Sequence, residues 1–374
     1  MATLTVGSSG RDYTTMAAAL GAASAGDTIA IDAGTYTEYH LDFYDANLTI
    51  KAAVETVGSP NDNAVILDGE GSTSKEYAFW SYASGATYQH LTMKNFEEYG
   101  VRAGNTAAKS LILSGCLIYG CDGPGISSLG TSWLGTPAEI KDSIIIVDEG
   151  RALNIGSNTP VYIYNSVLAT NANDESPLMS SINHNNVTAS HCTIIGQGWN
   201  GSDGRHYHLV SQVAQVDNCI VYGGNGHGIQ ANTHNNNLVY VTHADSNAYV
   251  EWEASGYDSD EVSASSGDLT GDPQFVTAPT LGSITPFNMD LNLQASSPAV
   301  NAGSSVFVHD ISGSTRDSDP DIGAYERVAV DSGYAHIIMT VAAGSLGNVI
   351  GVAKANVSKV LGVPADEEPP SFGG

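Results

Sequence analysis

The stretch GCLIY (115–119) contains a pattern that returns four more times along the chain: a turn-forming residue, then Cys or Ser, then an apolar run. The further copies are DSIII (142–146), NSVL (165–168), HCTII (191–195) and NCIVY (218–222). Successive Cys or Ser residues of the pattern are 27, 23, 26 and 27 positions apart. Looser apolar runs precede them at 48–50, 65–67 and 91–93. A recurrence of this kind indicates a repeat architecture.

The spacing indicates which repeat architecture it is. A coil of a parallel β-helix contains about three short strands and three turns, and therefore roughly 20–30 residues. Ankyrin and tetratricopeptide repeats need about 33 or 34 residues with helical periodicity, and leucine-rich repeats need a Leu/Asn ladder. A β-sandwich has hairpin turns without a fixed recurrence. We therefore predict an all-β fold, a parallel β-helix (solenoid) of roughly 9–11 coils within residues 39–327.

Stacking of coils also explains the choice of residues in the pattern. Neighbouring coils lie about 4.8 Å apart, so equivalent side chains lie directly above each other. We expect one inward column to contain Cys116, Ser143, Ser166, Cys192 and Cys219. The cysteines lack the paired spacing of a zinc site, so we interpret them as small buried residues, with a Cys116–Cys121 disulfide as the alternative. Loops at 196–204 and 223–237 are expected on one flank, where functional residues would lie.

The N-terminal segment, residues 1–38, has a different character. TTMAAALGAASA (14–25) is rich in Ala, with apolar residues near helical spacing, and predicts one short helix. DTIAI (27–31) predicts the first strand. A helix at this end would cover the open end of the solenoid core, which otherwise exposes unpaired backbone and apolar side chains. We therefore expect an N-terminal helical cap.

Both ends of the chain resemble a known superfamily. DYTTMAAALGAASAGDTIAIDAGTYTE (12–38) resembles the opening of right-handed parallel β-helix proteins of the pectate-lyase-like superfamily, with the whole order of its motifs kept. GDPQFV (271–276), LNLQASSPAVNAG (291–303) and DISGSTRDSDPDIGAYE (310–326) resemble the closing segment of many bacterial and phage β-helix proteins. The resemblance implies a right-handed solenoid. It implies no single activity, because lyases, hydrolases, adhesins and phage spikes share this fold.

Charge and hydropathy limit the possible partners. The formal net charge is −27, from 40 acidic and 13 basic residues, so we expect no binding to nucleic acid or to an anionic membrane. The acidity suits a large, soluble, exposed assembly, and calcium binding on acidic loops is the alternative. No apolar stretch reaches 18 residues, and MATLTVGSSGRDYTT (1–15) lacks the features of a secretory signal. We therefore expect synthesis and assembly in a host cytoplasm.

Candidate chemistry is sparse in the sequence. The best local group is DGRHYH (203–208) beside Trp199, which combines an acid, a base, two imidazoles and an aromatic platform, although a solvated loop would look the same. A second cluster contains Asp148, Glu149 and Arg151. Between 110 and 310 the cationic side chains are Lys141, Arg151 and Arg205, too few for a site that stabilises an enolate on an acidic sugar. We assign no catalytic, cofactor-binding or metal-binding residue, and we lean against an enzyme.

Two further parts of the sequence contain residues of the kinds that bind metals. The acidic run DSDE (258–261), with Asp268 and Asp272 nearby, could hold calcium, but it lacks the pattern of an EF-hand loop. Seven histidines occur in the middle coils without a metal-binding spacing: His184, His191, His206, His208, His227, His234 and His243. His206 and His208 would share one strand face, which suggests a metal. We more readily interpret the alternation as coincidence.

The closing motif contains charged residues at Asp310, Arg316, Asp321 and Glu326. We interpret them as a salt-linked cap of the last coil, with tight turns at Gly313 and Gly323. After it, residues 328–374 form an apolar extension that ends in an acidic tail at 364–374, and they weakly resemble tails of phage structural proteins. The extension is either a docking segment for a partner or a strand that folds back on its own coils.

These features favour a virion structural protein: a phage capsid decoration, a head fibre or a tail-fibre component, with possible glycan adhesion. Its expected partners are other virion proteins or copies of itself, as a homo-oligomer such as a homotrimer, and its expected location is the virion. Two alternatives remain open. One is a polysaccharide lyase or glycoside hydrolase acting on host surface glycans. The other is a bacterial surface adhesin.

Overall fold

The computed structural model describes residues 1–327 except 46, 56–57, 83–84, 104–110, 129–136, 156–159, 173–177, 181–186, 198–207, 225–226, 243–247, 249–263 and 305–306. Residues 328–374 lie outside the described residues, so the expected apolar extension stays a prediction. Among the described residues, no helix is long and apolar enough to span a membrane.

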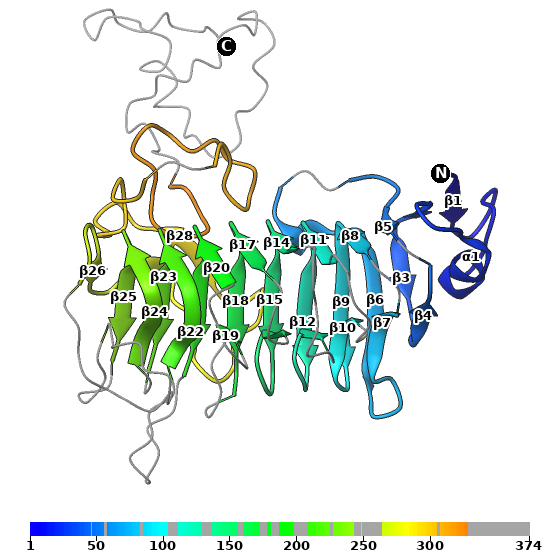
Figure 1. The fold of residues 1–374 in the computed structure, drawn as a ribbon, viewed down its shortest axis with the longest axis horizontal. Coiled ribbons are helices and arrows are strands. Elements are labelled where there is room, and N and C mark those ends of the chain that lie inside the picture. The colour runs from blue at the N-terminus through cyan, green and yellow to red at the C-terminus, as the bar shows by residue number, and fades with distance from the viewer. Residues whose placement is uncertain are drawn as a thin grey trace, which may run out of the picture. The chain divides into compact units, whose positions relative to one another are not determined.

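The described chain is a mostly β, parallel β-solenoid of about seven turns (Figure 1). Equivalent strands of successive coils pair in parallel and form three faces, here called sheets 1, 2 and 3; two of these faces are joined into one 16-stranded sheet, and the third is a 10-stranded sheet. The coil count is lower than the predicted 9–11. Six coils have a separate strand in each of the three sheets, and the residues after the last coil strand, β26 (Leu269–Thr270), do not form coils.

The three sheets are named here in the order in which a coil visits them. Sheet 1 contains β1 (Thr3–Val6), β2 (Thr28–Ile31), β5 (Leu48–Ala52), β8 (Ala86–Gln89), β11 (Leu111–Ser114), β14 (Ala138–Lys141), β17 (Val161–Tyr164) and β20 (Val187–Ser190). Sheet 2 contains β3 (Gly34–Tyr36), β6 (Val65–Ser72), β9 (Leu91–Phe96), β12 (Leu117–Cys121), β15 (Ile144–Val147), β18 (Val167–Thr170), β21 (Thr193–Gly196), β23 (Ile220–Gly223), β25 (Leu238–Val241) and β26. Sheet 3 contains β4 (Leu41–Phe43), β7 (Tyr77–Ser81), β10 (Tyr99–Ala103), β13 (Ile126–Ser128), β16 (Leu153–Ile155) and β19 (Leu178–Ser180).

Two long strands join sheets 1 and 3. The first half of β22 (His208–Asp217) pairs with β19 and its second half pairs with β20, and β24 (His227–Asn235) pairs along most of β22. The expectation of a variable loop over 223–237 was therefore wrong. The polar composition of these residues suggested a loop. They form a strand because the backbone of β24 pairs with that of β22 in the neighbouring coil.

The inward column predicted from the repeat spacing is confirmed. The strand registers place Cys116, Ser143, Ser166, Cys192 and Cys219 at equivalent positions in successive coils. Each side chain is fully buried. Hydrogen bonds run along the column: Cys116 N–H donates to Ser143 Oγ at 3.1 Å, and Ser143 N–H donates to Ser166 Oγ at 3.3 Å. All four cysteines are free, so no Cys116–Cys121 disulfide forms.

The turn-forming residue of the pattern marks the corner between sheets 1 and 2. At this corner one residue per coil adopts the left-handed region, with φ from 45° to 63°, at His90, Gly115, Asp142, Asn165, His191, Asn218 and Asn236. Gly, Asn, Asp and His tolerate this conformation better than other residues. Each copy of the pattern therefore begins at the corner with a residue that accepts positive φ. It continues with a small residue that points into the core.

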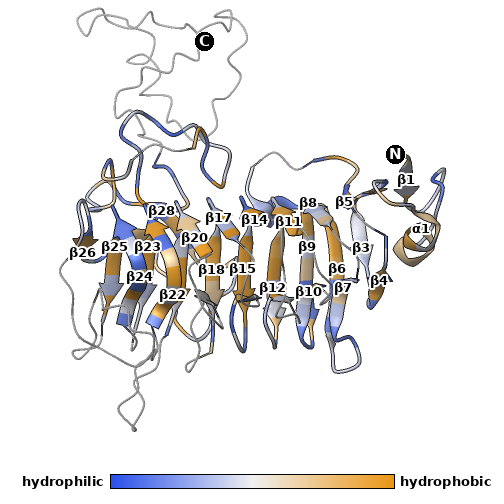
Figure 2. Cartoon of the chain, viewed as in Figure 1, coloured by the Kyte–Doolittle hydropathy of each residue, from blue (hydrophilic) through white to orange (hydrophobic). Residues whose placement is uncertain are grey.

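From β12 to β25, sheet 2 is largely buried on both of its faces. After β26, residues 271–327, called the strap from here on, run back along the outside of this sheet and include the antiparallel pair β27 (Phe275–Thr277) and β28 (Asp290–Leu293). The outward side chains of sheet 2 and the apolar side chains of the strap form a second core, which includes Ile144, Ile146 and Ile322. Because both faces are covered, runs such as that of β15 are apolar without alternation (Figure 2).

The strap contacts coils far from the last one. Asn171 Nδ2 donates to the carbonyl of Ile284 at 3.0 Å, and Asn61 Nδ2, from the 3₁₀ turn Pro60–Asp62, donates to the carbonyl of Pro286 at 3.1 Å. Gly323 has φ of 104°, and a Cβ there would lie 2.7 Å from Ile220 Cδ1, so only glycine permits this close approach.

The charged closing motif holds the strap in place. The guanidinium of Arg316 pairs with Glu326 at 3.2 Å and donates to the carbonyl of Gly323 at 2.8 Å and to Asn165 Oδ1 at 3.2 Å. Asn165 lies at the corner before β18, in the middle of the solenoid. The motif therefore fastens the strap to the flank of the middle coils, and the expectation that it caps the last coil was wrong.

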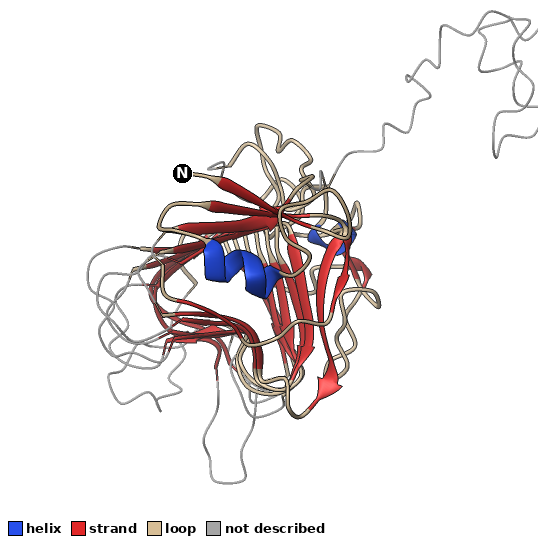
Figure 3. Cartoon of the chain, turned by 90° about the vertical axis from the view of Figure 1, so that its right-hand side faces the viewer, coloured by secondary structure: helices blue, strands red, loops and turns tan. Residues whose placement is uncertain are grey.

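One helix, α1 (Met16–Ala22), lies at the N-terminal end of the three sheets (Figure 3). It begins after Thr15, whose side chain accepts a hydrogen bond from Ala18 N–H at 3.3 Å. Met16, Ala19 and Leu20 are buried in the main core, so the apolar spacing read from the sequence corresponds to the buried face of this helix.

Candidate functional site

The structure describes only part of the loop group that the sequence favoured. Trp199, Asp203, Arg205 and residues 206–207 lie outside the described residues. His208 is described: it is buried at the start of β22, with its ring centroid 5.5 Å from that of His227 on β24. The predicted sharing of a face by His206 and His208 therefore stays a prediction.

The other candidate acids have mainly structural contacts. Asp148 accepts a hydrogen bond from Asn171 Nδ2 at 2.8 Å, and Asn171 also contacts the strap. Asp268, whose side chain is fully buried, pairs with His234 Nδ1 at 2.6 Å and accepts from Asn237 N–H at 2.8 Å. Burial raises the pKa of Asp268, but the bonds from His234 and Asn237 outweigh it and the net pKa is lowered.

Asp268 and the proposed calcium run do not form a described site. Asp272 accepts a hydrogen bond from Gln274 N–H at 2.8 Å, and residues 258–261 lie outside the described residues. In the parts of the chain that are described, no three His, Cys, Asp or Glu side chains converge as a metal site.

An aromatic column on the outer side of sheet 3 is a site that the sequence reasoning missed. Tyr44 follows β4, Trp80 lies in β7, and Tyr82 follows β7. The rings of Tyr44 and Tyr82 stack at 4.6 Å between centroids, with an interplanar angle of 15°. Trp80 and Tyr82 stack at 4.1 Å and 22°. Tyr44 is 71% exposed, so its outer ring face is open to solvent. We call Tyr44, Tyr82 and Trp80 the aromatic column.

A guanidinium closes the other end of the aromatic column. Arg102 on β10 lies directly beside Trp80 in the strand register, and its Cζ is 3.9 Å from the Trp80 ring centroid. The rings of Tyr77 and Tyr99 lie 5.8 Å and 5.6 Å from the same atom. Tyr77 is itself fixed, because its hydroxyl donates to Asp42 Oδ1 at 3.1 Å. Burial and the charge of Asp42 raise the pKa of Tyr77, so the phenol remains a donor.

The signal for this site was present in the sequence. The segment YAFWSY (77–82) places Trp80 and Tyr82 two residues apart, which puts them on one side of a strand and its continuation. The recurring pattern described sheet 2 and did not define the register of sheet 3. The alignment of Trp80 with Arg102 and with Asp42 became visible only from the strand pairing.

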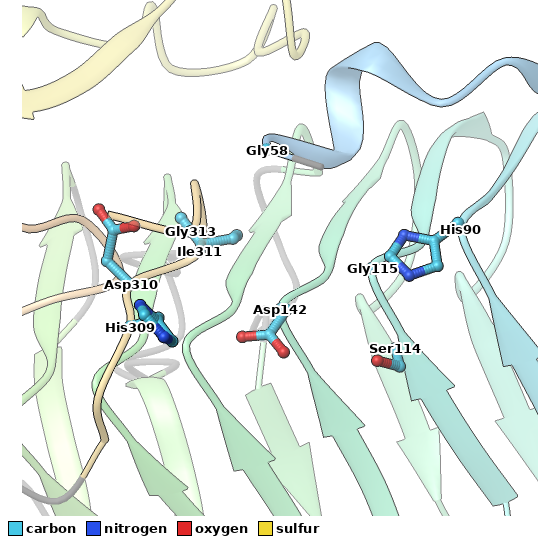
Figure 4. A pocket seen from close by; sticks show the side chains of 9 residues that line it. All are labelled: Gly58, His90, Ser114, Gly115, Asp142, His309, Asp310, Ile311 and Gly313. Carbon is cyan, nitrogen blue, oxygen red and sulfur yellow. The ribbon is translucent and has the colours of Figure 1, made fainter. Parts of the chain in front are cut away.

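A hollow lies at the corner between sheets 1 and 2 (Figure 4). It has a cavity volume of about 210 Å³ and is lined in part by His90, Gly115, Asp142 and His309. Gly115 lets the His90 ring lie close to the backbone at this corner, since a Cβ there would lie 2.6 Å from His90 Nδ1. Burial raises the pKa of Asp142 and lowers the pKa of His90, so burial favours the uncharged form of both side chains. We call this hollow the corner notch.

Comparison with known proteins agrees with the fold. No family model matches the sequence, and no curated protein matches it. Fourteen solved chains match the structure. A pectate lyase has a TM-score of 0.51 at 14% identity, over 88% of this chain and 97% of that one. The likeness to this enzyme establishes a parallel β-solenoid and nothing about activity.

Two further matches are more distant. A rhamnogalacturonan lyase has a TM-score of 0.46 at 12% identity, over 79% of this chain and 97% of that one. A pectin methylesterase from Aspergillus niger has a TM-score of 0.35 at 15% identity, over 71% of this chain and 83% of that one.

Proposed function

We propose that this chain is a structural, adhesive protein of a virion, a phage capsid decoration, head fibre or tail-fibre component, and that it contacts glycans through sheet 3. The observation that carries the adhesive part is the aromatic column. A flat ring that is open on one side and stacked on the other offers a rigid apolar platform with a polar edge, which suits the face of a sugar ring.

Rigidity is the reason for preferring Tyr44 over other exposed aromatic residues. Tyr82 supports its inner face, and Trp80 supports Tyr82 in turn. A ligand that stacks on Tyr44 therefore orders little that is not already ordered, and less conformational entropy is lost on binding. Phe287 is similarly exposed, at 66%, but its ring meets Tyr119 edge to face rather than in a stack.

The ends of the chain have structural roles in this proposal. α1 caps the N-terminal end of a right-handed solenoid, because Met16 and Leu20 fill the end of its core. The segment 328–374 docks the protein onto other virion proteins or onto copies of itself in a homo-oligomer. The double burial of sheet 2 makes the body stiff, as a particle component that extends into solvent requires.

Glycan binding is tested with one matched pair of variants. Titration calorimetry against a panel of bacterial surface polysaccharides should detect binding by the unmodified protein. Tyr44→Ala should weaken that binding at least about fivefold, because stacking on an aromatic ring contributes on the order of 1–3 kcal/mol. Phe287→Ala removes an equally exposed ring elsewhere and should leave binding within twofold. Equal affinity of all three proteins across the panel would rule out the platform.

The virion part needs a separate measurement. Mass spectrometry of purified phage particles from a producing host should find this polypeptide at a fixed ratio to the capsid protein. Particles that lack it, together with its presence on intact bacterial cells, would favour the bacterial adhesin instead. Both results are independent of the glycan titration.

The corner notch favours one alternative function, a polysaccharide lyase or glycoside hydrolase. An acid with a raised pKa in the same hollow as a half-buried imidazole is an arrangement that acid–base catalysis uses. On this alternative Asp142 donates a proton to a leaving oxygen. Reducing-sugar release or unsaturated product should then appear with the unmodified protein and disappear with Asp142→Asn. An absence of turnover across the same polysaccharide panel would eliminate the enzyme.

A further inference from the structure

We propose that Arg102 is the receptor for an oxyanion carried by the bound glycan, so that the site selects sugars with an acidic substituent. This inference rests on the proposed glycan contact at the aromatic column and adds its chemical selectivity. The ligand group is a carboxylate, sulfate or phosphate, all of which present oxygens that a guanidinium binds with paired, charge-assisted hydrogen bonds.

The first argument is that Arg102 has no acid to neutralise it. Arg11, Lys51, Lys75, Lys94, Lys141 and Arg316 each form a salt bridge with an Asp or Glu. Within the described part of the chain, no such pair involves Arg102, although the protein carries 40 acidic residues. An unpaired guanidinium in so acidic a chain is available to an anion from outside.

The second argument is that the guanidinium is already positioned. Three rings, those of Tyr77, Trp80 and Tyr99, surround it, and contacts of this kind hold an arginine without using its hydrogen bonds. The Tyr77 ring is fixed in turn by its bond to Asp42. The Arg102 side chain is therefore already ordered in the free protein, so little of its conformational entropy is lost when a ligand binds.

The third argument comes from two adjacent donors. Arg102 Nε and Trp80 Nε1 are both buried and have no hydrogen-bond partner among the described residues. Buried donors are usually paired, and a donor left unpaired costs free energy until an acceptor reaches it. The side chains that carry these donors stack, with Arg102 Cζ 3.9 Å from the Trp80 ring centroid, and their place at the end of the aromatic column indicates where an acceptor of the ligand would lie. An oxyanion supplies several acceptor atoms at once.

The geometry connects this receptor to the platform. Tyr44 follows β4, and Arg102 lies in β10, two coils further along sheet 3, or roughly 10 Å at the usual strand spacing. A short oligosaccharide spans that distance. One sugar would stack on Tyr44 while the acidic substituent of a neighbouring sugar reaches Arg102.

The experiment uses the full-length protein and four matched probes. They are a neutral oligosaccharide and its counterparts that bear a carboxylate, a sulfate or a phosphate. Calorimetry should show at least about tenfold tighter binding of one or more charged probes than of the neutral one, the gain expected from a charge-assisted contact. That preference should shrink as salt rises from low to physiological ionic strength. The three charged arms identify which oxyanion is preferred.

Variants assign the preference to Arg102. Arg102→Gln should remove the tenfold preference while affinity for the neutral probe stays within twofold, and Arg102→Lys should keep part of it. Lys94→Gln is the matched control, because it removes one positive charge at a salt bridge on sheet 2. A preference that survives Arg102→Gln, or that Lys94→Gln removes equally, would overturn the inference.

Failure of this inference differs from failure of the proposed function. If the unmodified protein binds neutral and charged probes equally, and Tyr44→Ala weakens both, the platform stands and the oxyanion receptor falls. If no probe binds, the glycan contact itself falls. Melting temperatures of all variants within about 3 °C of the unmodified protein identify the changes as local.

Discussion

Sheets 2 and 3 belong to the same coils, yet they have opposite surroundings. Sheet 2 is covered outside by the strap, and its outward Ile146 is as buried as the inward Ile145. Sheet 3 carries an aromatic column on its outer side, in which the Tyr44 ring is exposed and the guanidinium of Arg102 lies against Trp80. The difference shows that two faces of one solenoid can differ in what covers their outward side chains. One face is covered and contributes packing, while another keeps exposed side chains.

The largest expected effect is on the free energy of unfolding. It distinguishes Arg316, which is buried, from Arg102, which is half-buried. Arg316→Met should lower the free energy of unfolding by about 3–5 kcal/mol, because Glu326 and several carbonyls would remain buried without their partner. Arg102→Met should cost about 1 kcal/mol or less, since only cation–π contacts are lost. Urea denaturation of both variants measures the contrast. Similar losses would mean that the strap is not held by its charged cluster.

A second test compares outward side chains on the two sheets. Ile146→Ala should cost about 2–4 kcal/mol, the usual loss for a large aliphatic residue in a packed core. Tyr44→Ala should change stability by no more than about 0.5 kcal/mol, as for other exposed positions. Calorimetric melting of the two proteins is sufficient. An Ile146 variant that melts like the unmodified protein would show that the strap does not pack on sheet 2 in solution.

The smallest effect depends on pH and reports on the strap alone. Burial, together with the nearby charge of Arg316, lowers the pKa of His191 to about 3, and its ring meets Phe307 of the strap edge to face. The folded protein thus keeps His191 neutral while the unfolded chain protonates it below about pH 6.5. Stability from this group is complete above that pH and falls as the pH decreases toward 3. Between pH 6.5 and 5 the loss is about 1.5 kcal/mol.

A matched variant isolates this histidine. In His191→Gln the same denaturation series should lose that part of its slope between pH 6.5 and 5. The acid Asp268 does not confuse the measurement, because its lowered pKa places its own loss at pH values below the ordinary range of a carboxyl. An unchanged slope in the variant would show that His191 is accessible to protons in the folded state.

The inward column was predictable because it depends on local rules. In each coil, a residue that tolerates positive φ marks the corner. The small residue after it marks the core position, and the apolar run marks the strand. Asp142-Ser143 and Asn165-Ser166 are sufficient to align two coils. The path of the strap was not predictable in the same way. Its residues near Arg316 carry a turn-rich, polar pattern that is equally suitable for a cap, and only the contact with Asn165 places it.

The site on sheet 3 shows the same limit. Trp80 and Tyr82 were visible as a pair in the sequence, but the partners that give them meaning, Tyr44 and Arg102, lie on other coils. Loop lengths vary between coils, so the register of sheet 3 does not follow from the repeat spacing of sheet 2. The sequence identified a solenoid and its core, and the surface chemistry required three-dimensional alignment.

The strap also sets a limit on how this protein can change in length. A solenoid on its own could gain or lose a coil, such as the segment between Asp142 and Ser166, and still keep continuous sheets. Here a single segment is bonded to Asn218 through Ser304 and to Asn61 through Pro286, near opposite ends of the stack. Deleting one coil would shorten that distance by roughly 4.8 Å and leave the segment out of step. The length of the strap is therefore matched to the number of coils that it spans. Insertion or deletion of a whole coil requires a matching change in the length of the strap, whereas loops that the strap does not touch can change without this constraint.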